Sequence, residues 1–549
     1  MRLKKIVPLF LIISLGFIVS FDSPSERYFE IAKNMEILSS VYAEVNRYYV
    51  DEVDPNKIMK IGIDAMLGSL DPYTNYIPED DIEDFRFIST GQYGGIGALV
   101  GNRNEKVLIL MPYEGFPAYK AGLKIGDEIT KIGDEDVVGS KTDDISNLLK
   151  GQAGTPVTLK VNRYGIDSTL TFTLIREKIT IESVPYYGMV TDDIGYFVLT
   201  GFTRDAGDKV ENAITELKKQ GAKKFIFDLR DNTGGLLDEA VKISNLFIEK
   251  GKEVVSMKGK VSKWNETFYA PKDPLVPEAP LVILVNGRSA SASEIVSGVV
   301  QDYDRGILIG RHTYGKGLVQ ATMNTAYKSK VKVTTAKYYT PSGRCIQAID
   351  YGNRDEEGKA NRIPDSLLVE YRTTNNRLVY DGEGLTPDIE IDISPIANVT
   401  RALYNKNLIF EYATKYYYEN DTIVSPQQFD LKNEEFEKFR NWLTDKNYSY
   451  ELPSQRKLEE LVASLKSDSI FSATEETIEM LNNKIEMTKN DDLMKHKKEV
   501  KNQLESEIVS RYFFQKGIVE SSFTHDPDVL KAINVLNDQS VYNKVLARN

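Results

Sequence analysis

The sequence has a single cysteine, Cys345, among its 549 residues, so no intrachain disulfide can form. An exported chain of this length can do without one, because a large core buries enough apolar surface. Acidic residues outnumber basic ones, 81 to 69, so the formal net charge is −12, and there is no long basic run. A phosphate backbone would be repelled on average, which argues against a nucleic-acid partner.

Histidine is almost as rare, with three residues in the whole chain: His312, His496 and His525. The last two lie in a C-terminal region of helical pattern, remote in sequence from the α/β segment described below. A serine–histidine arrangement would therefore have to use His312, which stands close to Lys316. The sequence also lacks a G-x-G-x-x-G fingerprint, so a dinucleotide site has no support.

One apolar run stands apart from the rest of the chain. It is Ile6–Phe21, 16 residues long, and it follows the basic start Met-Arg-Leu-Lys-Lys. This run is long for a secretory signal and short for a spanning helix, which needs about 20 residues. No A-x-A cleavage site follows it. We predict that residues 1–22 are an export signal, either removed or kept as a membrane anchor; a buried core helix is the alternative.

The remaining sequence is too long for one hydrophobic core and changes pattern three times. Residues 23–88 have apolar side chains at helical spacing, and residues 89–175 alternate short apolar runs with glycine turns, as in a small β domain. In residues 176–395 strands alternate with helices, which predicts a sheet with helices packed on it. Residues 396–549 are almost entirely helical in pattern. The predicted fold class is a multidomain α+β protein.

The run VNGRSASASEI, residues 285–295, places alternating serines between an apolar strand and a helix. Ser291 and Glu294 have the spacing of a capping box, so the simplest interpretation is that Ser291 caps the helix. The same turn could present a serine nucleophile, because a helix N-terminus offers unpaired N–H groups where an oxyanion would form. Small Ala290 and Ala292 would let a peptide carbonyl approach.

A serine nucleophile needs a base, and Lys316 lies 25 positions after Ser291 in the run TYGKGLVQ. Lysine serves as a base when burial lowers its pKa toward neutrality. The flanking Gly315 and Gly317 allow tight packing around the amine. Gln320 projects to the same face of a strand as Lys316, where its amide could orient the amine. An exposed turn lysine is the simpler alternative.

A third run, FDLRDNTGGLLDEA, residues 227–240, leads from a strand through Gly234 and Gly235 into a helix. In the simpler interpretation the glycine pair only forms a turn. In the functional one, its N–H groups point at a developing oxyanion, with the Ala292 N–H as the second donor.

Together, these three runs resemble the carboxy-terminal processing (tail-specific) proteases, a family of Ser-Lys peptidases, and they occur in the family's order. The preceding runs YGGIG and GFPAYKAGLKIGDEI resemble a PDZ domain. The resemblance covers about residues 30–395 and implies a layered α/β core similar to the crotonase and Clp-protease type, with the PDZ domain inserted. It implies that Ser291 is the nucleophile, Lys316 the general base and Gln320 the residue that orients the lysine.

The resemblance also assigns supporting positions. Asp302 matches a family aspartate, and it follows Ser291 by 11 residues, close to three helical turns, so that both would share one helix face. The oxyanion region of the family is matched by Gly234, Gly235 and Ala292.

In the PDZ-like segment the resemblance implies that a bound peptide adds as an edge strand. N–H groups of one loop would hold its terminal carboxylate, and the loop residues are Gly94, Gly95, Ile96 and Gly97. Arg163 matches a position that links PDZ docking to activation in some relatives. Two features depart from the family pattern: His312, where the family needs no histidine, and residues 348–388, which are longer than the minimal pattern.

We therefore predict an exported serine endopeptidase, periplasmic or anchored facing the periplasm, that recognises the free apolar C-terminus of protein substrates through its PDZ domain. No metal or cofactor is implied. The C-terminal helices suggest dimerisation or substrate caging. Two alternatives stay open: a non-catalytic PDZ scaffold with a relic protease core, and a Ser-His hydrolase with His312 as base. The intact set of Ser291, Lys316 and Gln320 argues against the relic.

Overall fold

The computed structural model describes residues 24–82, 85, 87, 90–392, 395–446 and 448–547. The predicted export signal or anchor, residues 1–22, lies outside these ranges. The chain divides into two compact units, residues 1–76 and 77–549. Within the described ranges, no helix combines the length and the apolar character that a bilayer crossing requires.

The described part of the first unit is mainly helical, as predicted. It contains α2 (Pro24–Tyr48) and α3 (Pro55–Gly68), and the strand β1 (Asn75–Ile77) follows. Helix α3 begins where the Asp54 carboxylate accepts the N–H groups of Asn56 at 2.9 Å and Lys57 at 3.2 Å. This side chain and a proline in the first turn are ordinary helix-start signals.

The second unit is built around a six-stranded sheet with the order β10-β11-β12-β15-β16-β23. Strand β10 is antiparallel to β11, and the other strands are parallel. Every residue of β15 is buried, as expected of a parallel strand that is covered on both faces. The strands are β10 (Tyr186–Met189), β11 (Ile194–Val198), β12 (Lys224–Asp228), β15 (Leu281–Val285), β16 (Ile307–Gly310) and β23 (Ile389–Glu390).

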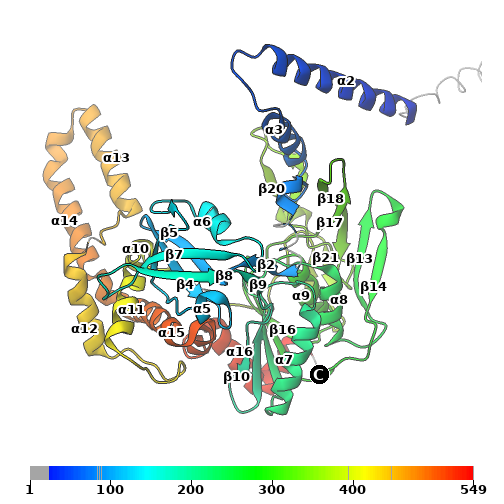
Figure 1. Ribbon diagram of the computed structural model, residues 1–549. Helices are drawn as coiled ribbons and strands as arrows, with labels where there is room; N and C mark the ends of the chain where they lie inside the picture. The colour runs from blue at the N-terminus through cyan, green and yellow to red at the C-terminus, as the bar shows by residue number, and fades with distance from the viewer. Residues whose placement is uncertain are drawn as a thin grey trace, which may run out of the picture. The chain divides into compact units, whose positions relative to one another are not determined.

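Alternate side chains of these strands enter two different cores, because successive residues of a strand point to opposite faces. Phe227 and Ile283 face helices α7 (Ala206–Lys219), α8 (Leu237–Asn245) and α9 (Ala292–Asp302). Ile226 and Val282 face α16 (Pro527–Asn537) and α17 (Gln539–Val545). The sheet is therefore the middle of three layers (Figure 1).

The position of α16 and α17 differs from the sequence analysis, which grouped them with the other C-terminal helices. Val529, Ala532 and Val535 of α16 are buried against the sheet. The Tyr542 hydroxyl of α17 accepts the N–H of Leu281 in β15 at 2.9 Å. The apolar sheet face needs a cover, and the end of the chain supplies it.

A second sheet is centred on β18 (Lys330–Tyr339). Strand β18 pairs with β13 (Glu253–Gly259) and with β17 (Leu318–Asn324), and β14 (Glu266–Tyr269) pairs with β13. Strand β17 begins two residues after Lys316, so the sheet fixes the end of the lysine segment. The long segment 348–388 adds two small pairs, β19 (Ile349–Arg354) with β20 (Ala360–Arg362) and β21 (Glu370–Arg372) with β22 (Leu378–Tyr380).

The PDZ domain lies in the chain between two strands that pair with each other, β2 (Gln92–Gly95) and β9 (Glu177–Thr180). Its own sheet has the order β3-β4-β5-β7-β8, which makes β3 an edge strand. The elements are β3 (Ala98–Arg103), β4 (Lys106–Pro112), α5 (Pro117–Lys120), β5 (Glu128–Ile132), β6 (Glu135–Asp136), α6 (Thr142–Leu149), β7 (Pro156–Asn162) and β8 (Leu170–Ile175).

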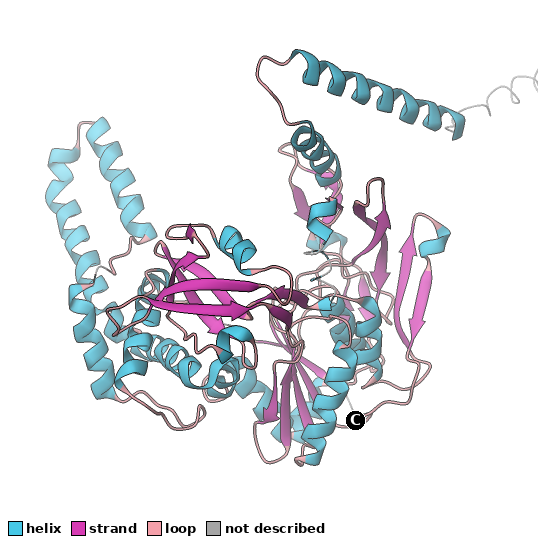
Figure 2. Cartoon of the chain, viewed as in Figure 1, coloured by secondary structure: helices cyan, strands magenta, loops and turns pink. Residues whose placement is uncertain are grey.

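The segment after residue 396 is mostly helical, as predicted, with a described non-helical connection at residues 420–432 (Figure 2). Before α16 it contains α10 (Asn398–Asn405), α11 (Leu408–Glu419), α12 (Asn433–Trp442), α13 (Pro453–Ser467), α14 (Phe471–Lys495) and α15 (Lys497–Ser522). Helices α10, α11, α12 and α15 share one hydrophobic core around Tyr412 and Phe439.

The PDZ domain packs directly on this helical segment. The guanidinium of Arg103 lies 5.1 Å from the centre of the Tyr404 ring, and Asn104 donates to the Lys406 carbonyl at 3.0 Å. In the same interface, Leu108 and Ile125 of the PDZ domain share a hydrophobic core with Phe410 of α11. Apolar packing and polar contacts together define a specific interface.

Glycine at position 126 is required for this contact. Gly126 has φ +94°, and a Cβ there would stand 2.9 Å from the side chain of Thr414 in α11. We expect Gly126→Ala to loosen the interface by about 1–3 kcal/mol, the usual cost of overpacking, and to speed amide hydrogen exchange in α11. Gly115→Ala is the control, because Gly115 has φ +82° with open space around it. Equal exchange in both variants would contradict the prediction.

Candidate active site

Ser291 lies between β15 and α9, at the N-terminus of the helix. Its φ of 57° and ψ of −115° are strained for a residue with a Cβ, and such strain is concentrated at functional sites. Its N–H donates to Glu294 Oε2 at 2.8 Å, one of the two bonds of the predicted capping box. The serine is therefore presented on a tight turn at the positive end of a buried helix.

Glu294 is fully buried and joins the serine turn to the lysine segment. Its Oε2 accepts the N–H groups of Ser291 at 2.8 Å and of Lys316 at 2.9 Å. Its Oε1 accepts the Gly315 N–H at 2.7 Å and the Thr313 hydroxyl at 2.5 Å. Burial raises the pKa of Glu294, and the four donors oppose that rise. Because one oxygen binds both nitrogens, the Ser291 and Lys316 backbones are neighbours.

Close packing holds the half-buried Lys316 segment on its other side. A Cβ on Gly315 would stand 2.3 Å from the Cβ of Ala348, and a Cβ on Gly317 would stand 2.7 Å from the nitrogen of Gln347. The Gly317 N–H also donates to Gln347 Oε1 at 2.8 Å. Both glycines are therefore needed for the approach, as the sequence analysis expected.

Gln320 lies in β17, four positions after Lys316, and is half-buried. Its Nε2 donates to the Thr334 hydroxyl of β18 at 3.2 Å. This cross-strand bond fixes the orientation of the amide. The predicted shared strand face is not observed, because Lys316 precedes β17 and the register shifts between Val319 and Gln320.

Asp302 lies at the end of α9 that is remote from Ser291. Its carboxylate binds the buried guanidinium of Arg344 at 2.8 Å and accepts the Ser342 N–H at 3.0 Å. These contacts hold the turn that follows β18. Any support that Asp302 gives the site is therefore transmitted through this turn.

The predicted oxyanion residues come together beside Ser291. A Cβ on Gly234 would stand 2.8 Å from Ser291 Cβ and 2.9 Å from the Ala292 nitrogen. The Gly234 N–H is occupied, since it donates to Asn232 Oδ1 at 2.9 Å. Within the described part of the chain, the Gly235 and Ala292 N–H groups have no acceptor. These two donors are the ones that remain for a ligand.

The side chain of His312 makes its contacts with Glu390 and Thr386, not with the serine turn. Its Nε2 lies 2.8 Å from Glu390 Oε1, and its Nδ1 lies 3.5 Å from the Thr386 hydroxyl. His496 and His525 lie in the C-terminal helical segment, and burial lowers the pKa of His525. Among the described residues, no group of three His, Cys, Asp or Glu side chains is arranged to hold a metal.

The predicted carboxylate loop leads directly into the edge strand β3. Gly94 and Gly95 end β2, whereas Ile96 and Gly97 form the turn before β3. Gly97 has φ +72°, and a Cβ there would stand 2.4 Å from the Phe116 side chain. The structure therefore places the glycine loop next to an open strand edge.

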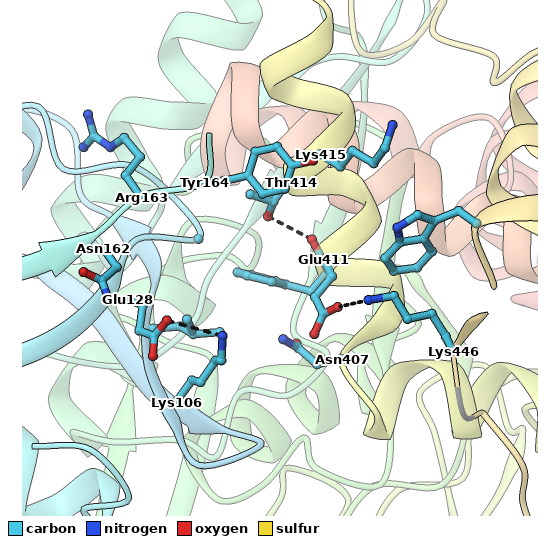
Figure 3. Close-up of a pocket in the computed structure, with 14 residues that line it drawn as sticks. Lys106, Glu128, Asn162, Arg163, Tyr164, Asn407, Glu411, Thr414, Lys415 and Lys446 are labelled. Carbon is cyan, nitrogen blue, oxygen red and sulfur yellow. Dashed lines mark hydrogen bonds and ion pairs between the residues drawn. The ribbon is translucent and has the colours of Figure 1, made fainter. Parts of the chain in front are cut away.

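Arg163 follows β7 and makes a bidentate pair with the buried Asp127, at 2.8 and 2.7 Å, while also donating to the Gly122 carbonyl. It lines a cavity of about 500 Å³ between the PDZ domain and α11, together with Thr414 and Glu411 (Figure 3). These hydrogen bonds of Arg163 therefore stabilise the PDZ face that meets the helical segment.

Sequence reasoning missed a second residue that contacts both key segments. The Tyr338 hydroxyl donates to the Lys316 carbonyl at 2.5 Å and lies 3.1 Å from the Ser291 carbonyl. Tyr338 belongs to an alternating strand run, in which a buried tyrosine is ordinary. No local signal distinguishes it.

Three family profiles match the chain. Peptidase family S41 matches residues 193–352, and the PDZ domain profile matches residues 109–163. A third profile, described as the C-terminal helical domain of a probable PDZ-protease, matches residues 399–536.

The chain is 36% identical over 321 residues to the carboxy-terminal-processing protease of Bartonella bacilliformis, covering 58% of this chain and 73% of that protein. It is 35% identical over 319 residues to the "Probable CtpA-like serine protease" of Staphylococcus aureus, covering 57% and 62%. The solved photosystem II D1 C-terminal processing protease is 27% identical, with 64% and 92% covered and a TM-score of 0.36. The chain therefore belongs to the carboxy-terminal processing proteases of peptidase family S41, serine proteases that here carry a PDZ domain.

Proposed function

We propose that this protein is an exported endopeptidase that binds the free, apolar C-terminus of a protein in its PDZ domain and cleaves that protein by a Ser-Lys mechanism. The observation that carries the proposal is the shared acceptor, since one oxygen of Glu294 binds the N–H groups of both Ser291 and Lys316. Two segments 25 positions apart are thereby held as one unit.

In this mechanism the neutral amine of Lys316 removes the proton of Ser291 Oγ as the oxygen attacks the scissile carbonyl. The carbonyl oxygen becomes an oxyanion, and the Gly235 and Ala292 N–H groups stabilise it. When the C–N bond breaks, the leaving amine takes the proton from Lys316, and an acyl-enzyme remains. Water then attacks the ester, with Lys316 again as base, and releases the new C-terminus. The Gln320 amide orients the lysine.

The edge strand β3 supports the proposed recognition of C-termini. A peptide would extend the sheet by pairing with β3, and the loop from Gly94 to Gly97 would offer N–H groups to its carboxylate. Export and anchoring are proposed from the apolar run Ile6–Phe21 and its basic start. A homodimer is proposed from α2, which exposes large apolar side chains such as Phe29, Met35 and Val41.

Peptide hydrolysis with free and amidated C-termini tests this proposal. We expect the wild type to cleave the free peptide, and amidation to raise KM about 10- to 100-fold, because charge-assisted hydrogen bonds to the carboxylate are lost. Ser291→Ala should bind the free peptide with unchanged affinity and should not cleave it. The KM of the wild type and the affinity of Ser291→Ala can be measured with the same pair of fluorogenic peptides, one free and one amidated.

Three outcomes would contradict parts of the proposal. Equal KM values for the two peptides would contradict recognition of the C-terminal carboxylate. A Ser291→Ala variant that cleaves at the wild-type rate would exclude Ser291 as the nucleophile. In the third outcome, the wild type binds the free peptide but cleaves neither this peptide nor a folded protein with the same C-terminus. That outcome would favour a scaffold with a relic core.

A further inference from the structure

The hydroxyl of Tyr338 lies between the backbone carbonyl oxygens of Ser291 and Lys316. It donates to the Lys316 oxygen at 2.5 Å, and the Ser291 oxygen lies 3.1 Å away. A hydroxyl has one proton, so the two carbonyls share it and the shorter contact takes the larger part. A single side-chain atom thus contacts the backbone of both predicted catalytic residues.

Tyr338 is itself held rigidly. It is 1% exposed and belongs to the central strand of the second sheet, where it is opposite Met257 of β13. Its N–H donates to the Gly317 carbonyl at 3.0 Å, next to Lys316. A large aromatic ring in a close-packed core, on a strand bonded on both sides, cannot shift without displacing its neighbours.

The contacts of Tyr338 complement those of Glu294. Glu294 accepts the N–H groups of Ser291 and Lys316, and Tyr338 donates to the carbonyl groups of the same two residues. Each residue is therefore held on both its amide and its carbonyl side. The two segments come from different parts of the fold, since one starts α9 and the other precedes β17.

The need for such a bridge follows from the local backbone. Ser291 has a strained positive φ, and Lys316 lies outside any helix or strand. The Ser291 carbonyl accepts the Ile295 N–H of α9 at 2.9 Å, but no ladder of a helix or strand includes Lys316. A misplacement of about 1 Å between reacting groups can cost about 100-fold in rate. The separation of these two backbones is thus a quantity that the protein has to fix.

We propose that Tyr338 is a positioning residue, whose hydroxyl sets the distance between the Ser291 and Lys316 backbones and thereby controls kcat without touching the substrate. This inference rests on the Ser-Lys mechanism proposed above. In the proposed function the substrate's C-terminus binds in the PDZ domain, to which Tyr338 does not belong.

The test is Tyr338→Phe, which removes one oxygen atom and keeps the ring. We expect kcat and the rate of Ser291 labelling by a fluorophosphonate probe to fall about 10- to 100-fold, with KM and the thermal unfolding midpoint close to those of the control. The matched control is Tyr303→Phe, because the Tyr303 hydroxyl donates to the Glu253 carbonyl at 2.9 Å at the other end of α9. This control loses a similar bond and should keep kcat.

Other results would overturn the inference. These are an unchanged kcat in Tyr338→Phe, an equal loss in Tyr303→Phe, or a loss that appears in KM or tracks the unfolded fraction. Ser291→Ala and Lys316→Ala, assayed in parallel, separate this failure from failure of the mechanism. If both are inactive while Tyr338→Phe is fully active, only the positioning role is wrong. If Lys316→Ala keeps the wild-type rate, the Ser-Lys mechanism itself fails.

Discussion

Replacing Lys316 with alanine should lower kcat/KM by about 10³- to 10⁴-fold, whereas replacing His312 with alanine should change it less than twofold. The first value is what removal of a general base from a nucleophilic site costs. The second follows from the contacts of His312, whose ring nitrogens lie by Glu390 and Thr386. Initial rates on one peptide, with the enzyme concentration corrected for folded protein, measure both.

Two further variants make this comparison specific. Lys316→Arg keeps the positive charge and should be as inactive as the alanine variant, because arginine does not release its proton at neutral pH. Lys328→Ala is the control, since Lys328 is an exposed lysine of the β17–β18 connection that pairs with Glu79 at 2.8 Å. A His312→Ala variant that is inactive while Lys316→Ala is active would instead establish the serine–histidine alternative.

The parts of the site that could be predicted from sequence are those encoded in short contiguous runs. Ser291 and its helix are marked by a strand, a small-residue turn and a capping-box spacing. Lys316 is marked by its two glycines, which the structure explains through the close approach of Ala348 and Gln347. In each case the local backbone requires a particular residue type, so a pattern is visible in the chain.

The contacts that join these runs could not be predicted. Glu294 was visible only as a capping residue, because its bonds to Gly315 and Lys316 depend on how two loops meet. Tyr338 is 47 positions from Ser291, and nothing in its neighbourhood distinguishes it from a core tyrosine. The cover of the sheet by α16 was missed for the same reason, since an amphipathic helix does not specify which surface it will cover.

Arg230 connects α16, which covers the central sheet, directly to the run of residues 227–240 that contains the predicted oxyanion glycines. The guanidinium of Arg230 binds Asp228 at 2.6 Å, and it also binds Asp526 at 2.8 Å and Asp528 at 2.9 Å at the start of α16. Tyr196 adds a hydrogen bond to Asp228 at 2.6 Å. One cation thus joins the end of β12, just before the glycine pair, to the C-terminal helix.

Replacing Arg230 with methionine should therefore lower the thermal unfolding midpoint by about 10 °C. The variant leaves a cluster of buried carboxylates without their main counter-charge, and breaking such a network costs about 3–5 kcal/mol. Arg288→Met is the matched control. Arg288 lies 3.5 Å from Asp231 in an exposed pair, with side chains 74% and 67% exposed, and such pairs contribute little. Equal midpoints for the two variants would contradict the prediction.

The loss in thermal unfolding midpoint of Arg230→Met should also depend on pH, because Asp528 is a buried carboxylic acid next to Arg230. Burial raises the pKa of Asp528, and Arg230 opposes this rise, so the loss of Arg230 raises the pKa further. An acid whose pKa is higher in the folded state than in the unfolded state destabilises the fold when it is ionised. This penalty is complete above the folded-state pKa and disappears as the pH falls through it. The midpoint of Arg230→Met should therefore approach that of the wild type as the pH is lowered through the raised folded-state pKa of Asp528, and a deficit that grows on acidification would exclude a buried carboxylate as its cause.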